Sequence, residues 1–583
     1  TNFNLPICQN LLHMIDTEKI NLSSENIMYI IAECAIQLLL KRNTNIFSDD
    51  SKHFLLQYLN DKLFISKYSK LIDALIDNKE AAIAFCKKYP SLFNLNYKYE
   101  KNEDVLGLIY ISCKNIGNRK ATGSYFTPTS IVKKIISRLN FQSADTILDP
   151  CCGTGNFLLQ LPELCSFENI YGNDIDLISV KIARINMALK FPDAAPDIIC
   201  QHITNMDYLN VFPNDKFNFV IGNPPWGFDF SNEMKKNLVE KFNAINGKNI
   251  ESYDIFIEKA FKNLTHNGHI AYILPEAVLN VKSHINIRKI ILQISSINYI
   301  EFLGNAFDGV QCPCIFLDLV YTGQNLSTVN TTITNGIEKF TIKTKRNITA
   351  DNFTFITNDS EYAILEKIKK RPDIIMLKNN ADFALGIVTG NNKKYISNNK
   401  TADNEMILKG SDISKYHIKQ SDNYIIFTPE NFQQVAPVQM YRAPEKLFYR
   451  FICNQLVFAY DNRQTLSLNS CNIVIPRIDG LHIKYILAIL NSRIAQFIYK
   501  KEFNSVKVLR NHIEHIPIPI VSEQKQNEII ELTDILIRGI DDEQTYIIYD
   551  KLDDIIFNLW ALSNDEINII KNAIDNENMF LTP

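Results

Sequence analysis

The sequence predicts an α/β protein with a central open parallel sheet, a helical amino-terminal segment and a mixed α/β carboxyl-terminal domain. Between about residues 121 and 322, short apolar runs of β type alternate with amphipathic stretches. Strands that alternate with helices pair in parallel, since each crossover helix returns the chain to the same end of the sheet. In the same region, acidic residues follow successive apolar runs, at the strand ends where open α/β sheets bind ligands.

The length of 583 residues exceeds what one hydrophobic core supports, so several domains are expected. Apolar residues at helical spacing predict helices at 23–42, 482–501 and 549–574. The expected division is a helical region at 1–120, a catalytic α/β domain at 121–322, a connecting segment at 323–375, a mixed α/β domain at 376–520 and two carboxyl-terminal helices within 521–583.

The composition indicates a folded globular protein, with 46% hydrophobic and 21% charged residues. Twelve scattered cysteines are typical of buried thiols in a reducing compartment. Cys312 and Cys314 have no second pair at zinc spacing, so no metal is expected. No charged-then-apolar leader and no uncharged apolar run of about 18 residues occurs, which predicts a soluble cytoplasmic protein without membrane contact.

Basic charge is concentrated in one part of the chain. The formal net charge is −3, but residues 376–520 hold 18 Lys and Arg against 11 Asp and Glu. Such a region is either an ordinary solvated face or a surface for nucleic acid. The charge count alone leaves both interpretations open.

The segment TILDPCCGTGNFLL (146–159) has the pattern of a strand, a glycine-containing turn and a helix. This turn lies where an open α/β sheet binds a nucleotide-like ligand. Gly153 and Gly155 would allow the backbone to approach the ligand closely. Asp149, at the end of the strand, can accept a hydrogen bond from an ammonium group, directly or through water.

Two further acids follow the next two apolar runs. Asp174 lies in YGNDID, where a carboxylate is expected to bind two ribose hydroxyls, and Ile175 can pack on an adenine ring. Asp207, in NMDYL, can accept from the adenine amino group. Each alone would be read as a turn residue. Their order and spacing favour a nucleoside-containing cofactor.

The string VIGNPPWG (220–227) closes a fourth apolar run and suggests chemistry on an aromatic amine. The lone pair of such an amine is delocalised into its ring, so attack on a methyl sulfonium needs acceptors that draw both N–H bonds out of the plane. Asn223 Oδ1 and the Pro224 carbonyl can be those acceptors. Pro225 restricts the backbone, and Trp226 offers a face for stacking a base. The alternative is a surface turn with a core tryptophan.

The order GSYFTP (123–128), DPCCGTGNF, NDID, NMDY and NPPW resembles the γ-class amino-methyltransferases that act on adenine in DNA. The resemblance implies a Rossmann-like SAM-dependent methyltransferase sheet, S-adenosylmethionine (SAM) as methyl donor and N6 of a flipped adenine as acceptor. It places Tyr125, Phe126 and Thr127 over the methionine end of SAM. FLGNAFDGVQCPCIFLDLV (302–320) resembles a later motif, which sets Phe307 against the flipped base opposite Trp226. The further cofactor contacts it implies are Asp149, Cys151, Asp174, Ile175, Asp207, Tyr208 and Pro225.

The resemblance extends into the basic region. LKGSDISKYHI (408–418) and the segment 489–520 are similar to target-recognition domains of type I and type IIG restriction–modification systems. Double-stranded DNA is therefore the expected partner and residues 376–520 the expected sequence reader, in a monomer associated with the bacterial nucleoid. The residues expected to contact DNA are Asn462, Arg463, Arg493, Asn504, Lys507 and Arg510. At least one of them is expected to read a base edge.

Residues 1–120 contain no convincing nuclease motif of paired acids and a lysine. The chain thus resembles nuclease-less orphan methyltransferases of the kind associated with sporulation in clostridia. Two other functions stay open. Release-factor glutamine and ribosomal RNA amino-methyltransferases use a similar Asn-Pro-Pro-aromatic string, and a specificity subunit can retain the fold without turnover.

Overall fold

The computed structural model describes residues 3–20, 22–43, 52–65, 67–114, 127–247, 250–307, 311–324, 328–503, 505–539 and 542–574. The chain divides into two compact units, Thr1–Thr354 and Phe355–Pro583. The border falls inside the segment expected to connect two domains. Of the residues singled out above, Tyr125, Phe126 and Asn504 lie outside the described residues. Across the described residues, no helix is long and apolar enough to cross a bilayer.

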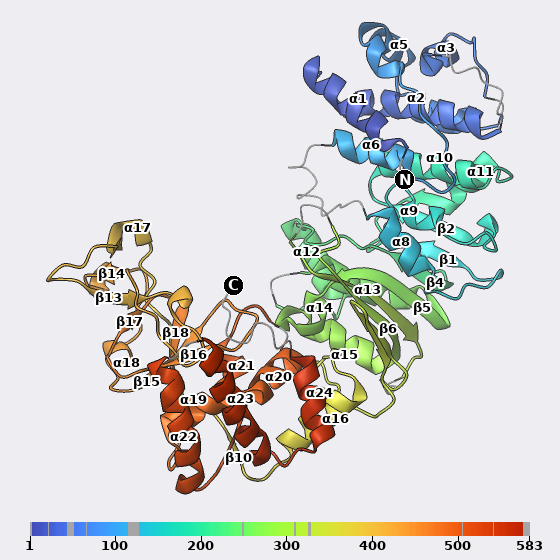
Figure 1. Ribbon diagram of the computed structural model, residues 1–583. Helices are drawn as coiled ribbons and strands as arrows, with labels where there is room; N and C mark the ends of the chain where they lie inside the picture. Colours follow the sequence, from blue (N-terminus) through green and yellow to red (C-terminus); the bar gives the residue numbers. More distant parts are fainter. Residues whose placement is uncertain are drawn as a thin grey trace. The chain divides into compact units, whose positions relative to one another are not determined.

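The first unit begins with short helices (Figure 1). They are α1 (Leu5–Thr17), α2 (Ser24–Asn43), α3 (Phe54–Leu59), α4 (Ser69–Asp73), α5 (Lys79–Lys88) and α6 (Val105–Cys113). Helix α2 confirms the helix expected at 23–42, and its middle turns are buried. Helices α2, α4 and α6 contact α10 (Leu177–Lys190) of the α/β region, so the helical segment is packed onto the sheet's own helices.

A nine-stranded sheet forms the centre of the first unit, in the order β3-β2-β1-β4-β5-β7-β6-β8-β9. Its strands are β1 (Ile147–Asp149), β2 (Ile170–Asp174), β3 (Ile203–Asn205), β4 (Phe217–Gly222), β5 (Leu264–Pro275), β6 (Ser295–Gly304), β7 (Cys314–Tyr321), β8 (Thr332–Asn335) and β9 (Glu338–Thr341). Strands β3, β2, β1, β4 and β5 are mutually parallel. Together with the mixed second unit, this confirms the predicted fold class. Strand order reverses at β1, the point where such sheets bind ligands.

Strand β7 departs from the expected parallel arrangement. It pairs antiparallel with both β5 and β6. The connection from β6 to β7 covers residues 305–313, which is too short for the crossover that a parallel pair requires. Strands β8 and β9 then extend the same sheet, so the first part of the expected connecting segment belongs to the first unit.

The remaining helices of the first unit alternate with its strands along the chain, and two of them begin at side-chain caps. The remaining helices are α8 (Thr129–Ile136), α9 (Asn156–Leu159), α10, α11 (Pro196–His202), α12 (Asn232–Lys241), α13 (Ser252–Lys262), α14 (Ala277–Asn280) and α15 (Ile285–Ile294). The Asp176 side chain accepts from Ile178 N at the start of α10, and Ser231 caps α12 in the same way. These caps fix the loops that follow β2 and β4, where the expected site residues lie.

The second unit is mixed α/β. Its helices are α16 (Asp359–Lys369), α17 (Asn392–Tyr395), α18 (Val438–Tyr441), α19 (Ile483–Asn491), α20 (Arg493–Glu502), α21 (Arg510–Glu514), α22 (Glu523–Arg538), α23 (Asp542–Leu559) and α24 (Asn564–Ala573). Its strands are β10 (Ile374–Met376), β11 (Ala381–Ala384), β12 (Ile396–Ser397), β13 (Glu405–Leu408), β14 (Tyr424–Ile425), β15 (Lys446–Arg450), β16 (Phe458–Asp461), β17 (Leu466–Ser467), β18 (Cys471–Pro476) and β19 (Pro517–Pro519). Two four-stranded sheets, β11-β18-β15-β16 and β12-β14-β13-β17, carry most of the strands.

Two of the three expected helices are interrupted. The helix expected at 482–501 is two helices, α19 and α20, which separate at Ser492. Ser492 has an extended backbone, and its hydroxyl accepts from Ala495 N, so it caps a new helix. The helix expected at 549–574 is likewise divided by a capping box between Ser563 and Glu566. The carboxyl-terminal part therefore has three described helices, α22 to α24, where two were expected.

Candidate functional site

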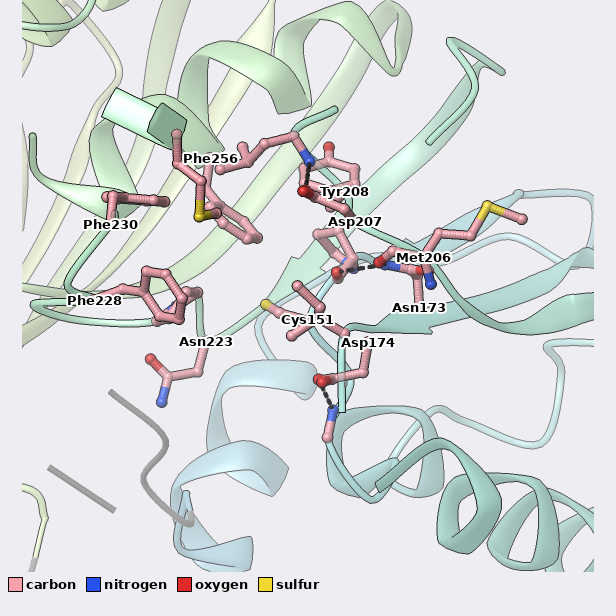
Figure 2. Close-up of a pocket in the computed structure, with 16 residues that line it drawn as sticks. Cys151, Asn173, Asp174, Met206, Asp207, Tyr208, Asn223, Phe228, Phe230 and Phe256 are labelled. Atoms are coloured by element: carbon pink, nitrogen blue, oxygen red, sulfur yellow. Dashed lines mark hydrogen bonds between the residues drawn. The ribbon is translucent and has the colours of Figure 1, made fainter. Parts of the chain in front are cut away.

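A pocket lies at the carboxyl ends of β1, β2, β3 and β4, as the positions of the expected acids predict (Figure 2). It encloses about 890 Å³ of space, part of it open to solvent. Asn173 and Met206 lie on one side, and Phe228 and Phe230 lie on the other (Figure 2). The lining residues are Pro150, Cys151, Gly153, Asn173, Asp174, Ile175, Met206, Asp207, Tyr208, Leu209, Asn223, Pro225, Phe228, Phe230, Met234 and Phe256.

A second pocket adjoins the first around the glycine turn. It is lined by Tyr110, Ile111, Lys114, Thr127, Cys151, Cys152, Gly153, Thr154, Asn156, Phe157, Asp174, Asp176, Ser179 and Asn223. Cys151, Gly153, Asp174 and Asn223 line both pockets. The two hollows therefore meet at the end of β1, and a long ligand can occupy both.

Asp174 holds the glycine turn in place. Its Oδ2 accepts from Gly153 N at 2.8 Å (Figure 2), and its Oδ1 accepts from Asp176 N at 2.8 Å. Burial raises the pKa of Asp174 to about 6, because a charged carboxylate is costly away from water. Hydroxyl donors from a ligand would offset part of that cost.

Asp149 lies beneath the turn and lines neither pocket. It is 1% exposed, and its Oδ1 accepts from Cys151 N at 3.2 Å. Its Oδ2 is buried and has no hydrogen-bond partner among the described residues. Burial holds the pKa of this carboxyl well above its usual range. Gly222 has a φ of +141°, and a Cβ there would lie 2.6 Å from Asp149 Oδ1, so this position requires glycine.

Asp207 and Tyr208 form the edge of the first pocket near β3. Asp207 Oδ1 accepts from Leu209 N at 3.0 Å (Figure 2), and Oδ2 accepts from the Asn210 side chain at 2.7 Å. Tyr208 is buried, and its ring centroid lies 5.2 Å from that of Phe256. A carboxylate beside two aromatic rings suits a flat ring that carries an amino group.

Asn223 follows β4 and lines both pockets. Its Nδ2 donates to Thr127 Oγ1 at 3.1 Å, which orients the amide. Its Oδ1 is buried without a hydrogen-bond partner among the described residues. A buried amide oxygen costs free energy when it accepts nothing, so this atom is suited to a donor on a ligand.

Trp226 and Phe307 lie together, as the resemblance implies, but they contact each other. Their ring centroids are 4.9 Å apart with an interplanar angle of 80°, and both side chains are buried. The edge of one ring fills the face of the other. A base can stack between them only after one ring has moved.

Two parts of the chain match known families. Residues 101–363 match the family described as N-6 DNA Methylase, and residues 405–518 match the TaqI-like C-terminal specificity domain. The matched ranges together span more than half of the sequence. The segment 101–363 belongs to the N-6 DNA methylase family. Its nine-stranded sheet, with β7 inserted antiparallel beside β5, is typical of SAM-dependent methyltransferases.

Individual relatives and a solved structure are similar to this chain. The Type II methyltransferase M.VspI of Vibrio sp. (strain 343) is 26% identical over 339 residues, covering 56% of this chain and 78% of that protein. The solved structure of the Type IIL restriction–modification enzyme MmeI in complex with DNA shares the fold, with a TM-score of 0.65, 13% identity and coverage of 98% of both chains. Release factor glutamine methyltransferase of Buchnera aphidicola is 31% identical over 209 residues, covering 33% of this chain and 70% of that protein.

The structure gathers most of the cofactor residues expected in this N-6 DNA methylase segment. The first pocket includes Ile175, Asp207, Tyr208 and Pro225, and the second includes Thr127. Gly155 lines neither pocket, so its approach to the ligand stays a prediction. It caps α9 at a φ of +93°, a left-handed backbone conformation that favours glycine.

Sequence reasoning missed one wall of each pocket. Four apolar residues that line the first pocket were not predicted: Phe228, Phe230, Met234 and Phe256. In the sequence they look like ordinary core residues. Only the FDF string directly after NPPW gave a signal, since its two phenylalanines follow the expected catalytic residues. The wall of the second pocket comes from α6, in a region to which the motifs assigned no chemistry.

In the second unit, the residues expected to contact DNA differ in exposure. Asn462 and Arg463 are exposed after β16, and Lys507 is exposed before α21. The Arg510 side chain is also exposed, at 61%, although it pairs with Glu514 at 2.8 Å. A buried ion pair between Lys446 and Asp461 at 2.6 Å, together with bonds from Thr465 to Asp461, anchors the 461–465 loop.

Arg493 does not fit the expected DNA contact. Its side chain is 7% exposed, and it pairs with Asp553 at 3.0 Å and with Asp550 at 2.7 Å. The guanidinium also lies 4.9 Å from the ring of Tyr549. It begins α20 and fastens that helix to α23, so its charge is used inside the second unit.

Arg493→Ala is expected to lower the free energy of unfolding by about 3 kcal/mol, because it leaves Asp553 buried without its partner. Chemical denaturation followed by circular dichroism measures this. Arg463→Ala, at an exposed arginine of the same unit, is expected to stay within about 0.5 kcal/mol of the unaltered chain. Equal stability of the two variants would contradict the internal role of Arg493.

Proposed function

We propose that this chain is a site-specific DNA adenine methyltransferase. It transfers a methyl group from SAM to N6 of an adenine that has been flipped out of double-stranded DNA. The observation that carries the proposal is Asn223 Oδ1, an acceptor that is buried where two pockets meet and has no partner among the described residues. Family membership and the TaqI-like specificity domain support DNA as the substrate.

SAM, when bound, would supply an electrophilic methyl group on a sulfonium. The residues present fit it: the first pocket has a carboxylate for ribose hydroxyls and a second carboxylate beside aromatic rings, and the second pocket has room for the amino-acid end. Asp174 would bind the ribose hydroxyls. Asp207 would accept from the adenine amino group, with Ile175 and Tyr208 against the ring.

Asn223 and Pro224 would act on the amine of the substrate. Asn223 Oδ1 and the Pro224 carbonyl accept its two N–H bonds and so localise the nitrogen lone pair toward the methyl group. The Pro225 carbonyl accepts from Ser252 Oγ at 2.5 Å, which fixes the loop to α13. Trp226 would stack on the flipped base after Phe307 has moved aside, and stacking of about 1–3 kcal/mol offsets much of the unstacking cost.

The second unit would read the DNA sequence. It contains the TaqI-like specificity domain and, within residues 376–520, the segment that has an excess of basic residues. MmeI, which has the same fold, was solved with DNA. The rival readings account for less of the chain, since the glutamine methyltransferase match covers 33% of it.

Incubation of the full chain with plasmid DNA and methyl-labelled SAM tests the proposal. After digestion to nucleosides, the label is expected in N6-methyladenine. Label in cytosine, or in added RNA or release factor and not in DNA, would overturn it. Tight binding of SAM and DNA without transfer would favour a silent specificity subunit.

The affinity for SAM is expected to depend on pH through Asp174. Its pKa of about 6 lies above the usual value for an aspartate, so the charged form that accepts ribose hydroxyls dominates above pH 6. Affinity should therefore be full above pH 6 and fall as the pH drops below it. Calorimetry from pH 5 to pH 8 measures this. Asp174→Asn should flatten the profile. Because the buried Asp104 also has a pKa of about 6, an unchanged profile in that variant would contradict the assignment to Asp174.

Alanine variants of the exposed residues separate base contacts from phosphate contacts. The set is Asn462, Arg463, Lys507 and Arg510, together with Asn504. Loss of a phosphate contact should weaken methylation of all sequences alike and reduce the salt slope by about one per charge. Loss of a base contact, worth about 1–3 kcal/mol, should relax the modified motif at one position. Uniform losses in every variant would place sequence readout elsewhere or in DNA deformability.

A further inference from the structure

Helix α6 (Val105–Cys113) forms a wall of the second pocket, although it lies in the helical region to which the sequence motifs assigned no chemistry. Tyr110, Ile111 and Lys114 line this pocket together with Gly153 and Asp174 of the cofactor turns. The wall thus comes from a segment about 40 residues before the glycine turn.

The start of α6 is fixed to the glycine turn by a buried carboxylate. Asp104 caps the helix by accepting from Gly107 N at 2.8 Å. The same carboxylate accepts from Thr154 Oγ1, within the turn, and from Asn186 Nδ2 at 2.7 Å. Asp104 is 4% exposed, so these bonds are shielded from water. These hydrogen bonds therefore hold the start of α6 in a fixed position relative to the glycine turn.

The end of α6 is fixed to the loop after β2. Tyr110 Oη donates to Asp176 Oδ2 at 2.8 Å, and Ser179 Oγ donates to the same carboxylate oxygen at 2.9 Å. Lys114 Nζ lies 3.5 Å from Asp176 Oδ2 and 5.0 Å from the centroid of the Tyr110 ring. The ammonium of Lys114 is thereby held at the pocket wall, with 24% of its side chain exposed.

We propose that Lys114 binds the α-carboxylate at the methionine end of SAM. This inference rests on the proposed function, in which Asp174 and Asp207 hold the adenosine end in the first pocket. The amino-acid end then enters the second pocket, which shares Gly153 and Asp174 with the first. Among the described residues that line the second pocket, Asp174 and Asp176 carry negative charge, and Lys114 carries the positive charge. A carboxylate is repelled by the two acids, so it needs this cation.

Ligands with different amino-acid ends test the proposal on the full chain, because each ligand's Kd is compared between the variant and the unaltered protein. The probes are S-adenosylhomocysteine, which retains the carboxylate, decarboxylated SAM, which retains only the ammonium, and 5′-methylthioadenosine, which has neither. Lys114→Gln is expected to raise the Kd of S-adenosylhomocysteine about tenfold, the effect of losing a charged hydrogen bond. It should leave the Kd of the other two ligands unchanged, and Lys114→Arg should restore most of the affinity.

Lys181→Gln is the matched control. Lys181 lies on α10, pairs with Asp77 at 3.4 Å with 14% of its side chain exposed, and lines neither pocket. The Lys181→Gln variant should bind all three ligands with unchanged affinity. An equal loss for all ligands in Lys114→Gln, or no loss for any, would overturn the proposal. Failure of the unaltered chain to bind S-adenosylhomocysteine or SAM would instead overturn the proposed function itself.

Discussion

Asn223→Ala is expected to reduce kcat for adenine methylation by at least about a hundredfold and to leave the Kd of SAM unchanged. The variant removes an acceptor that acts only on the amine of the substrate, and loss of one such preorganised group costs about two to three orders of magnitude in other enzymes. The side chain follows β4, and its Nδ2 donates one hydrogen bond among the described residues, to Thr127, so the fold should persist. Single-turnover kinetics with labelled SAM, beside calorimetry for SAM, measure both quantities.

Two variants separate the acceptor from its orientation. Asn223→Asp retains an acceptor oxygen and should keep more activity than Asn223→Ala. Thr127→Val removes the hydroxyl that Asn223 Nδ2 donates to at 3.1 Å but leaves Oδ1 in place. It should reduce kcat much less. A Thr127→Val variant as slow as Asn223→Ala would mean that the amide acts through this bond, and near-normal turnover in Asn223→Ala would exclude the acceptor role.

Asp174→Ala is expected to weaken SAM binding by about a hundredfold while affinity for DNA changes little. Two hydrogen bonds to a charged carboxylate are worth about 1.5–3 kcal/mol each, and their loss in a buried site is not replaced by water. Part of the lost affinity comes from the loss of hydrogen bonds within the protein, since Asp174 also accepts from Gly153 N and Asp176 N. Calorimetry with SAM and fluorescence anisotropy with a labelled duplex measure the two affinities.

Asp174→Asn retains one acceptor oxygen and should lose less affinity than Asp174→Ala. Asp215→Ala is a control, because Asp215 is exposed and lines neither pocket. Unchanged SAM affinity in Asp174→Ala would refute the ribose assignment. An equal loss of DNA affinity would indicate that the variant disturbs the whole unit.

The parallel part of the fold could be predicted because its signals are local. Asp149, Asp174 and Asn223 each follow an apolar run, and parallel strands bring such ends to one edge of the sheet. The pattern of apolar residues alone did not show that β7 pairs antiparallel with β5 and β6, because the direction of β7 depends on the length of the connection before it. Nor did apolar spacing show the helix break at Ser492, where a side-chain cap outweighs continued helical periodicity.

Site residues supplied by distant packing were beyond sequence reasoning. Lys114 reaches the second pocket because Asp104 and Tyr110 fasten α6 to loops that follow much later in the chain. Arg493 looked like a DNA contact because it lies in a basic region, but charge counts do not show burial.

Sequencing of modified bases in DNA from cells that express this chain tests the central claim most directly. Cells that express the Asn223→Ala variant and cells without the chain are the controls. The account predicts N6-methyladenine at one defined sequence motif in the first cells and at none of those sites in the two controls. Absence of that motif despite abundant folded protein, or its persistence with Asn223→Ala, would contradict a DNA adenine methyltransferase that works through Asn223.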